Sequence, residues 1–181
     1  PLSRDDSGRF KRILVALDAS DAANRALNEA VRLAASSGGN VAGIHVYAAK
    51  MHDRRFRQME GGLPEQFRKE DEMERQRDVH DTLITKGLGI ISDSYHDGAS
   101  AACEQTGLPY RRFSPEGKNY RGIVHQAASG EHDLLAMGAV GLGVTPGSTV
   151  GTVCERVVRR SEINVLVVRD PERSLGDGPL V

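Results

Sequence analysis

The sequence predicts a doubly wound α/β fold, in which five parallel strands form a sheet with helices on both faces. The first observation is a set of short runs of consecutive apolar residues, which are typical of strands buried on both sides. The second is that these runs alternate with segments whose apolar residues recur every three or four positions, the pattern of amphipathic helices. The chain of 181 residues also has the length of a single domain.

The first 47 residues contain one strand–helix–strand unit. Residues 13–17 (ILVAL) form a continuous apolar run and predict the first strand. Residues 18–21 (DASD) are typical of a turn followed by a helix N-cap, so we expect the strand to end there. The apolar spacing over 23–34 predicts a helix. The Gly-Gly-Asn sequence at 38–40 ends the helix, and residues 41–47 predict the second strand.

The segment that follows is long, charged and helical in character. Ten of the fourteen residues from 65 to 78 are charged, and opposite charges fall at helical spacing, which predicts a solvated helix. We expect Gly87 and Gly89 to interrupt this pattern before a second helical stretch over 90–104. The whole segment is therefore either one long helix or two helices, together with a loop over 49–64.

The second half of the chain alternates strands and helices in a regular way. Apolar runs predict strands at 110–113, 133–137 and 164–168. Helical spacing predicts helices over 120–128 and 150–158 between them. Parallel strands joined in this order require right-handed crossovers, which leads to the doubly wound sheet.

We expect one domain over residues 11–170, with an extended helical insertion at 49–109. Two tails flank the domain, at 1–10 and at 171–181. The first tail is polar and lacks the apolar core of a signal peptide.

Composition and charge exclude several classes of function. The net charge of −1 leaves no basic field that would attract nucleic acid or an anionic membrane. Aromatic residues make up only 4% of the chain and Trp is absent, so stacking platforms for single-stranded nucleic acid are not expected. No apolar run approaches the length of a membrane span. We therefore expect neither a nucleic-acid nor a membrane partner.

The cysteines and histidines predict no metal site and no disulfide. Cys103 and Cys154 have neither zinc-ligand spacing nor a disulfide framework around them, and we expect two buried thiols in a cytoplasmic, reducing setting. Four histidines precede an aspartate, but they fall on different elements without a convergent pattern.

Two loops are candidates for a ligand site, because doubly wound sheets bind ligands beyond the carboxyl ends of their strands where strand order reverses. These loops are 18–20 and 138–151. The glycines of the second loop would let backbone N–H groups approach a phosphate, and Ser148, Thr149 and Thr152 add hydroxyl donors. The chain has no Walker A motif and no Rossmann fingerprint. Taken alone, the second loop is either a phosphate cradle or a structural turn.

The spacing Gly138-x2-Gly141-x9-Gly151-Thr152 matches the ATP-binding signature of the universal stress protein family. The chain resembles this family over about residues 9–48 and 110–170. The resemblance implies an adenine-nucleotide α-hydrolase-like sheet with strand order 3-2-1-4-5. It also implies a role in the stress response, and a homodimer paired through the last strand, 164–168.

Carried over by position, the resemblance implies a nucleotide site. Its residues would be Ala16, Leu17, Asp18, Val41, Met137, Gly138, Gly141, Gly151, Thr152 and Val153. The first three would line the adenosine side, with Asp18 near the ribose, and Val41 would contact adenine through its backbone. Met137 and Gly138 would lie under the ribose and phosphates. The phosphates would be surrounded by Gly141, Gly151, Thr152 and Val153. Asp18 also fits a helix cap, and Met137 also fits a core residue.

Two departures from the family pattern concern the strength of binding. Ala19 stands where the family often has Gly, and residues 142–150 contain no Lys or Arg, which the family's phosphate loop often carries. These differences imply binding that is weaker, dependent on Mg²⁺, or tuned to AMP or ADP rather than ATP.

The sequence favours a nucleotide-binding module that acts by binding, because no residue stands out as a catalytic base or nucleophile. Three alternatives stay open. One is a dimer with an empty nucleotide site, and a second is slow ATP hydrolysis. The third is an adenylating enzyme of the pyrophosphatase type on a related fold, which would need a further catalytic motif.

Overall fold

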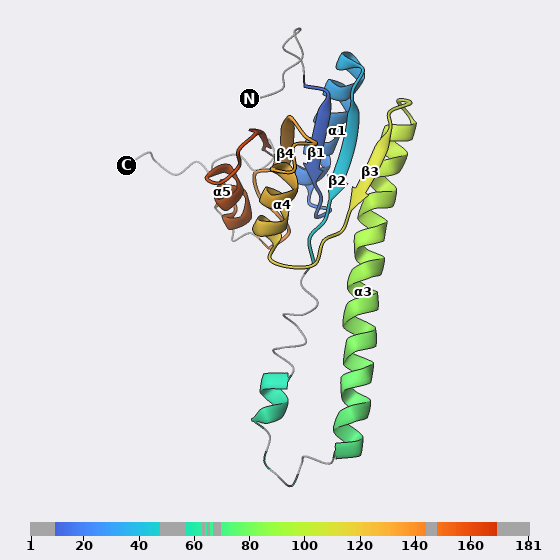
Figure 1. The fold of residues 1–181 in the computed structure, drawn as a ribbon, viewed down its shortest axis with the longest axis vertical. Helices are drawn as coiled ribbons and strands as arrows, with labels where there is room; N and C mark the ends of the chain where they lie inside the picture. Colours follow the sequence, from blue (N-terminus) through green and yellow to red (C-terminus); the bar gives the residue numbers. More distant parts are fainter. Residues whose placement is uncertain are drawn as a thin grey trace, which may run out of the picture.

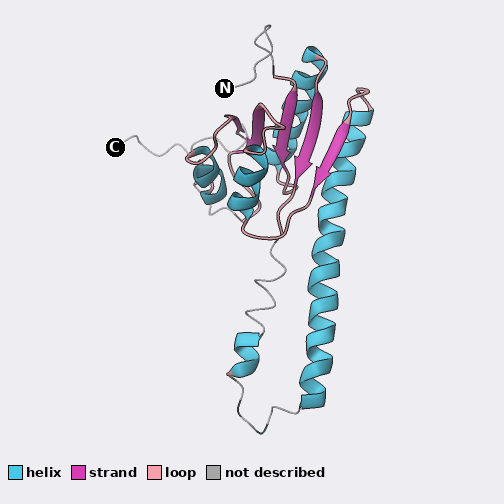
Figure 2. Ribbon diagram, in the orientation of Figure 1, coloured by secondary structure: helices cyan, strands magenta, loops and turns pink. Residues whose placement is uncertain are grey.

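The computed structural model describes residues 10–47, 57–62, 64, 66, 70–143 and 148–169. It contains a five-stranded parallel sheet in the order β3-β2-β1-β4-β5, which confirms the predicted fold and strand order (Figure 2). The strands are β1 (Arg12–Ala16), β2 (Asn40–Ile44), β3 (Tyr110–Phe113), β4 (Leu134–Gly138) and β5 (Asn164–Val168).

Helices cover both faces of this sheet (Figure 1). They are α1 (Asp21–Ser37), α3 (Glu70–Glu104), α4 (Asn119–Ala127) and α5 (Thr152–Val158). Successive side chains of β1 point to opposite faces, so Ile13 and Val15 pack with α1 and α3, whereas Leu14 packs with α4 and α5. This alternation explains why the first strand reads as a continuous apolar run.

Helix α1 begins and ends as the sequence predicts. The Ser20 side chain accepts a hydrogen bond from the backbone N–H of Ala23, and Gly38 adopts the left-handed conformation with φ of 65° at the other end. The buried face of the helix is built mainly of alanines, which lets it lie close to the sheet.

The boundaries of several elements differ by a few residues from those expected. β2 stops at Ile44 instead of continuing to Tyr47, and Tyr47 forms an isolated bridge with Glu116. Helix α5 begins at Thr152, two residues later than expected. Phe10, which we expected in the first tail, packs against the core; the rest of that tail and the whole second tail lie outside the described residues.

Helix α3 runs for 35 residues without a break, so the expected interruption at Gly87 and Gly89 was wrong and the single-helix alternative is right. A Cβ at either glycine would meet nothing, so these positions serve no packing purpose. An interior glycine costs only about 1 kcal/mol relative to alanine. Packing of the last turns, through Ala99 and Cys103, holds the C-terminal part of this helix on the sheet.

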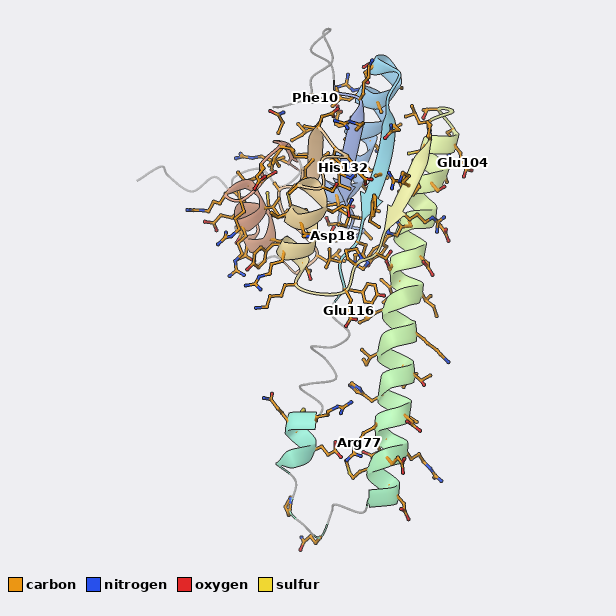
Figure 3. The ribbon with its side chains drawn as sticks, in the orientation of Figure 1. Phe10, Asp18, Arg77, Glu104, Glu116 and His132 are labelled. Atoms are coloured by element: carbon orange, nitrogen blue, oxygen red, sulfur yellow. The ribbon has the colours of Figure 1, made fainter. Side chains whose placement is uncertain are left out.

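The N-terminal half of α3 extends past the carboxyl ends of the strands (Figure 1). A short helix at 57–61 lies beside it, joined by an ion pair between Glu60 and Arg77 (Figure 3). The side chains at 71–78 are mostly exposed, as predicted for the charged helix, although Met73 is buried. Much of the expected 49–64 loop lies outside the described residues. None of the described helices combines the length and apolarity needed to cross a membrane.

Candidate functional site

A cavity of about 470 Å³ opens at the carboxyl ends of the central strands. It lies where the strand order reverses between β1 and β4, which is the position expected for a ligand in this fold. Its wall comes from the ends of β1, β2 and β4, from the loop after β4, and from the first residues of α4 and α5. The volume falls within the range of small-molecule sites.

The structure brings together most of the residues that the sequence proposed for the site. Nine of the ten line the cavity: Ala16, Leu17, Asp18, Met137, Gly138, Gly141, Gly151, Thr152 and Val153. Met137 belongs both to the cavity wall and to the hydrophobic core beneath it. Ser148 also lines the cavity, whereas Thr149 is absent from its wall.

Val41 is the exception, and its placement corrects the sequence prediction. It pairs with Ile13 and Tyr110 at the beginning of β2, where it is buried, and it does not reach the cavity. The end of β2 faces the cavity instead, through residues 44–46 (Ile-His-Val). In a strand, each residue adds about 3.3 Å, so the three steps from Val41 to Ile44 correspond to about 10 Å along β2. The rule that ligands bind at carboxyl ends would have selected Val46.

Asp18 organises the turn between β1 and α1 (Figure 3). One of its carboxylate oxygens, Oδ1, accepts hydrogen bonds from the backbone N–H of Ser20 at 3.0 Å and from the Ser20 hydroxyl at 2.6 Å. The Ser20 oxygen then accepts the N–H of Ala23 at 3.2 Å and so caps the helix. Ser20, not Asp18, is therefore the cap, and Asp18 holds the cap in position.

The turn also contains the departure from the family pattern. Ala19 has φ of 57°, and it is the non-glycine residue with positive φ in the described part of the chain. An L side chain is strained in this left-handed region, whereas glycine is not. A glycine at this position would adopt the same conformation without strain.

The first two signature glycines are needed for close packing. A Cβ at Gly138 would lie 2.7 Å from the backbone nitrogen of Ala23, at the start of α1. A Cβ at Gly141 would overlap the second carboxylate oxygen of Asp18, Oδ2. Gly151 has ordinary contacts at 3.5 Å and beyond, and its N–H donates to the carbonyl of Ala139 at 2.8 Å. Gly138 and Gly141 are therefore required for packing of the fold, in addition to any role in binding a ligand.

His45 is a cavity residue that the sequence reasoning missed. Its ring packs edge-on against Tyr95, with 4.9 Å between ring centroids. Burial lowers the pKa of His45 below its usual value of 6.5, and the nearby His96 lowers it further, whereas Asp18 opposes the shift. Its Nδ1 is buried and has no hydrogen-bond partner among the described residues. The ring is therefore favoured in its neutral form.

Asn119 and Ile123 of α4 were also missed, because no local signal connects them with the glycine loop. The two cysteines are free and buried, as predicted. Burial raises the pKa of the Cys103 thiol to about 11, with help from Glu104, and burial also raises the pKa of Cys154. Within the described ranges, no three His, Cys, Asp or Glu side chains gather as metal ligands.

Known proteins are similar to this chain over most of its length. The model of the universal stress protein family matches residues 9–169. The Staphylococcus saprophyticus protein SSP1056, named as a universal stress protein, is 25% identical over 165 residues, which cover 90% of this chain and 86% of that protein.

Solved structures share the fold at low sequence identity. The protein MJ0577 has a TM-score of 0.69 and 20% identity, covering 89% of this chain and 96% of its own. A universal stress protein solved in complex with cAMP has a TM-score of 0.57 and 22% identity, covering 88% of this chain and 97% of its own.

Proposed function

The chain belongs to the universal stress protein family, and from this premise we propose that its cavity binds an adenine nucleotide. The observation that carries the proposal is the cavity itself, which lies at the strand-order reversal and is lined by the signature glycines and by Asp18. The cAMP complex of a structural relative supports an adenine ligand. The proposed ligands are ATP, ADP or AMP, with Mg²⁺ as a partner of the longer phosphate chains.

The lining chemistry suits the three parts of a nucleotide. Apolar side chains at the ends of β1 and β2, such as Leu17 and Val46, offer a surface for the base. The carboxylate of Asp18 is an acceptor for ribose hydroxyls. The glycine loop and the start of α5 offer backbone N–H groups and the Thr152 hydroxyl to phosphates, because the first N–H groups of a helix have no partner within it.

The proposed mode of action is binding rather than chemistry. Residues 142–150 contain no cation that could stabilise a transferring phosphoryl group, and Cys154, the thiol at the cavity, is buried with a raised pKa. We place the protein in the cytoplasmic stress response and expect it to act as a homodimer. Support for the dimer comes from β5, an edge strand with half-buried side chains whose outer side is unpaired among the described residues.

Calorimetric titration of ligand-free protein with AMP, ADP and ATP, with and without Mg²⁺, tests the proposal. Binding of at least one nucleotide below millimolar concentration is the expected result, and phosphate release measured in parallel would detect slow hydrolysis. Thr152→Ala should weaken binding about three- to tenfold by removing a hydroxyl donor. Thr149→Ala is the matched control, since Thr149 does not line the cavity. If no nucleotide binds, the dimer with an empty site becomes the better account.

A further inference from the structure

Three arginines gather around one tyrosine on the outer surface of α4 and α5. The guanidinium carbons of Arg121, Arg156 and Arg160 lie 5.9, 5.3 and 5.5 Å from the centre of the Tyr120 ring. Tyr120 is half-buried and packs against the core, so it holds a fixed place between the helices. We call these four residues, together with the adjacent Lys118, the Tyr120 cluster. Many nitrogen-tipped side chains project from this part of the molecule (Figure 3).

Within the described part of the chain, no carboxylate forms an ion pair with a member of the Tyr120 cluster. The nearest carboxylate on α5, that of Glu155, is already paired with Arg159 at 2.8 Å. The guanidinium carbons of Arg156 and Arg160 both lie within 5.5 Å of the centre of the Tyr120 ring, and like charges this close together repel each other. The hydrogen bond from Arg121, together with nearby positive charges, lowers the pKa of Tyr120, as expected in cationic surroundings. An anion at this surface would relieve the repulsion.

On both helices, a residue of the cavity wall lies within one turn of a member of the Tyr120 cluster. On α4, Asn119 lines the cavity, and its neighbours in the sequence are Lys118 and Tyr120. On α5, Thr152 lines the cavity and Arg156 follows one turn later on the same face, whereas Arg160 lies two residues past the end of the helix at Val158. A phosphate chain that leaves the cavity past Thr152 would therefore meet Arg156 next.

We propose that the Tyr120 cluster binds the outer phosphates of the nucleotide and makes the protein prefer longer phosphate chains over AMP. This proposal rests on the nucleotide site proposed above. Guanidinium groups bind phosphate oxygens through paired, charge-assisted hydrogen bonds, and the Tyr120 hydroxyl can donate another. The cluster supplies, from the neighbouring helices, the cations that residues 142–150 lack.

The test compares AMP and ATP binding, without Mg²⁺, in wild type and in the double variant Arg156→Gln/Arg160→Gln. Wild type should bind ATP more tightly than AMP. The double variant should bind ATP about tenfold more weakly and AMP within about twofold of wild type, so the preference disappears. Arg159→Gln is the matched control, because Arg159, the C-cap residue of α5, lies between the two in sequence but pairs with Glu155. A thermal melt of each variant checks that the fold is retained.

Each other outcome has a distinct meaning. If wild type and the double variant bind AMP equally and also bind ATP equally, the inference is overturned while the nucleotide site survives. If wild type binds neither ligand, the proposed function and the inference fall together. Tripolyphosphate serves as a probe for an independent phosphate site. The proposal would also be overturned if AMP-saturated protein bound tripolyphosphate as tightly as free protein does, and if the double variant bound ATP as tightly as wild type does.

Discussion

Gly141 packs so closely against Asp18 that a Cβ at position 141 would overlap the carboxylate oxygen Oδ2. Asp18 follows β1 and Gly141 follows β4, so the contact joins the loops on the two sides of the strand-order reversal. The same carboxylate positions Ser20, the cap of α1. One side chain thus connects the cavity wall with the start of a helix.

Replacing Gly141 by alanine should disturb both sides of this connection. We expect Gly141→Ala to displace the Asp18 carboxylate, to lower the free energy of unfolding by about 1–3 kcal/mol and to weaken nucleotide binding. Denaturant unfolding and calorimetric titration measure the two effects. Gly87→Ala is the control: a Cβ there meets nothing, and loss of an interior helix glycine should raise stability by about 0.5–1 kcal/mol. Unchanged stability and binding in Gly141→Ala would contradict the prediction.

Ala19→Gly should stabilise the protein. The substitution removes the strain of a left-handed alanine at φ of 57°, although the greater freedom of glycine in the unfolded chain offsets part of the gain. We expect a net increase of up to about 1 kcal/mol in the free energy of unfolding. Ala101→Gly, at an exposed position within α3, should instead lower the free energy of unfolding. Destabilisation by both substitutions would show that the strain at Ala19 is not significant.

Stability should fall at acidic pH because burial lowers the pKa of three histidines, His45, His96 and His132, below 6.5. The unfolded chain binds protons at these residues more readily than the fold does. Their contribution is therefore complete above pH 6.5, and it is lost as the pH falls through the lower pKa values of the folded state. The free energy of unfolding should be smaller at about pH 5 than at about pH 8.

A pair of variants isolates this effect. His96 is fully buried, whereas His125 on α4 is exposed. His96→Asn should reduce the difference in stability between the two pH values, and His125→Asn should leave that difference as in wild type. An undiminished pH difference in His96→Asn would rule out a contribution from His96.

Association through the edge strand should be sensitive to Val167. The N–H of Ala139 donates to the carbonyl of Val168 at 2.8 Å, so the peptide groups of Val167 point away from β4, toward the free edge. We expect a homodimer at micromolar concentration by light scattering, and we expect Val167→Lys to shift it to the monomer. A cooperative thermal transition of the variant would show that the fold survives. A monomeric wild type would refute the proposed assembly.

Local patterns in the sequence predicted the strands well, because full burial of a parallel strand leaves a continuous apolar run such as residues 13–17. They failed at Gly87 and Gly89, since the length and packing of α3 outweigh two unfavourable residues. Val41 was assigned by its position in the resemblance to the family and not by a local pattern, and it lies at the beginning of β2, away from the cavity. The sequence predicted the glycine loop from its spacing.

The Tyr120 cluster could not be predicted from the sequence. Its members come from two helices separated by β4 and are brought together only when α4 packs against α5. No spacing within either helix indicates that Tyr120 will lie beneath Arg156 and Arg160. The same reason applies to Asn119, which reaches the cavity from α4 while the glycine loop approaches from β4.

The reach of α3 divides the molecule into parts that should open independently. At about 1.5 Å per residue, its 35 residues span about 50 Å, and only the C-terminal part is packed on the sheet. Farther from the sheet, Val79, Leu83 and Ile90 are 52%, 67% and 70% exposed. Backbone amides before Gly87 should therefore exchange with deuterium through local fraying, whereas those near Cys103 should exchange only through global unfolding.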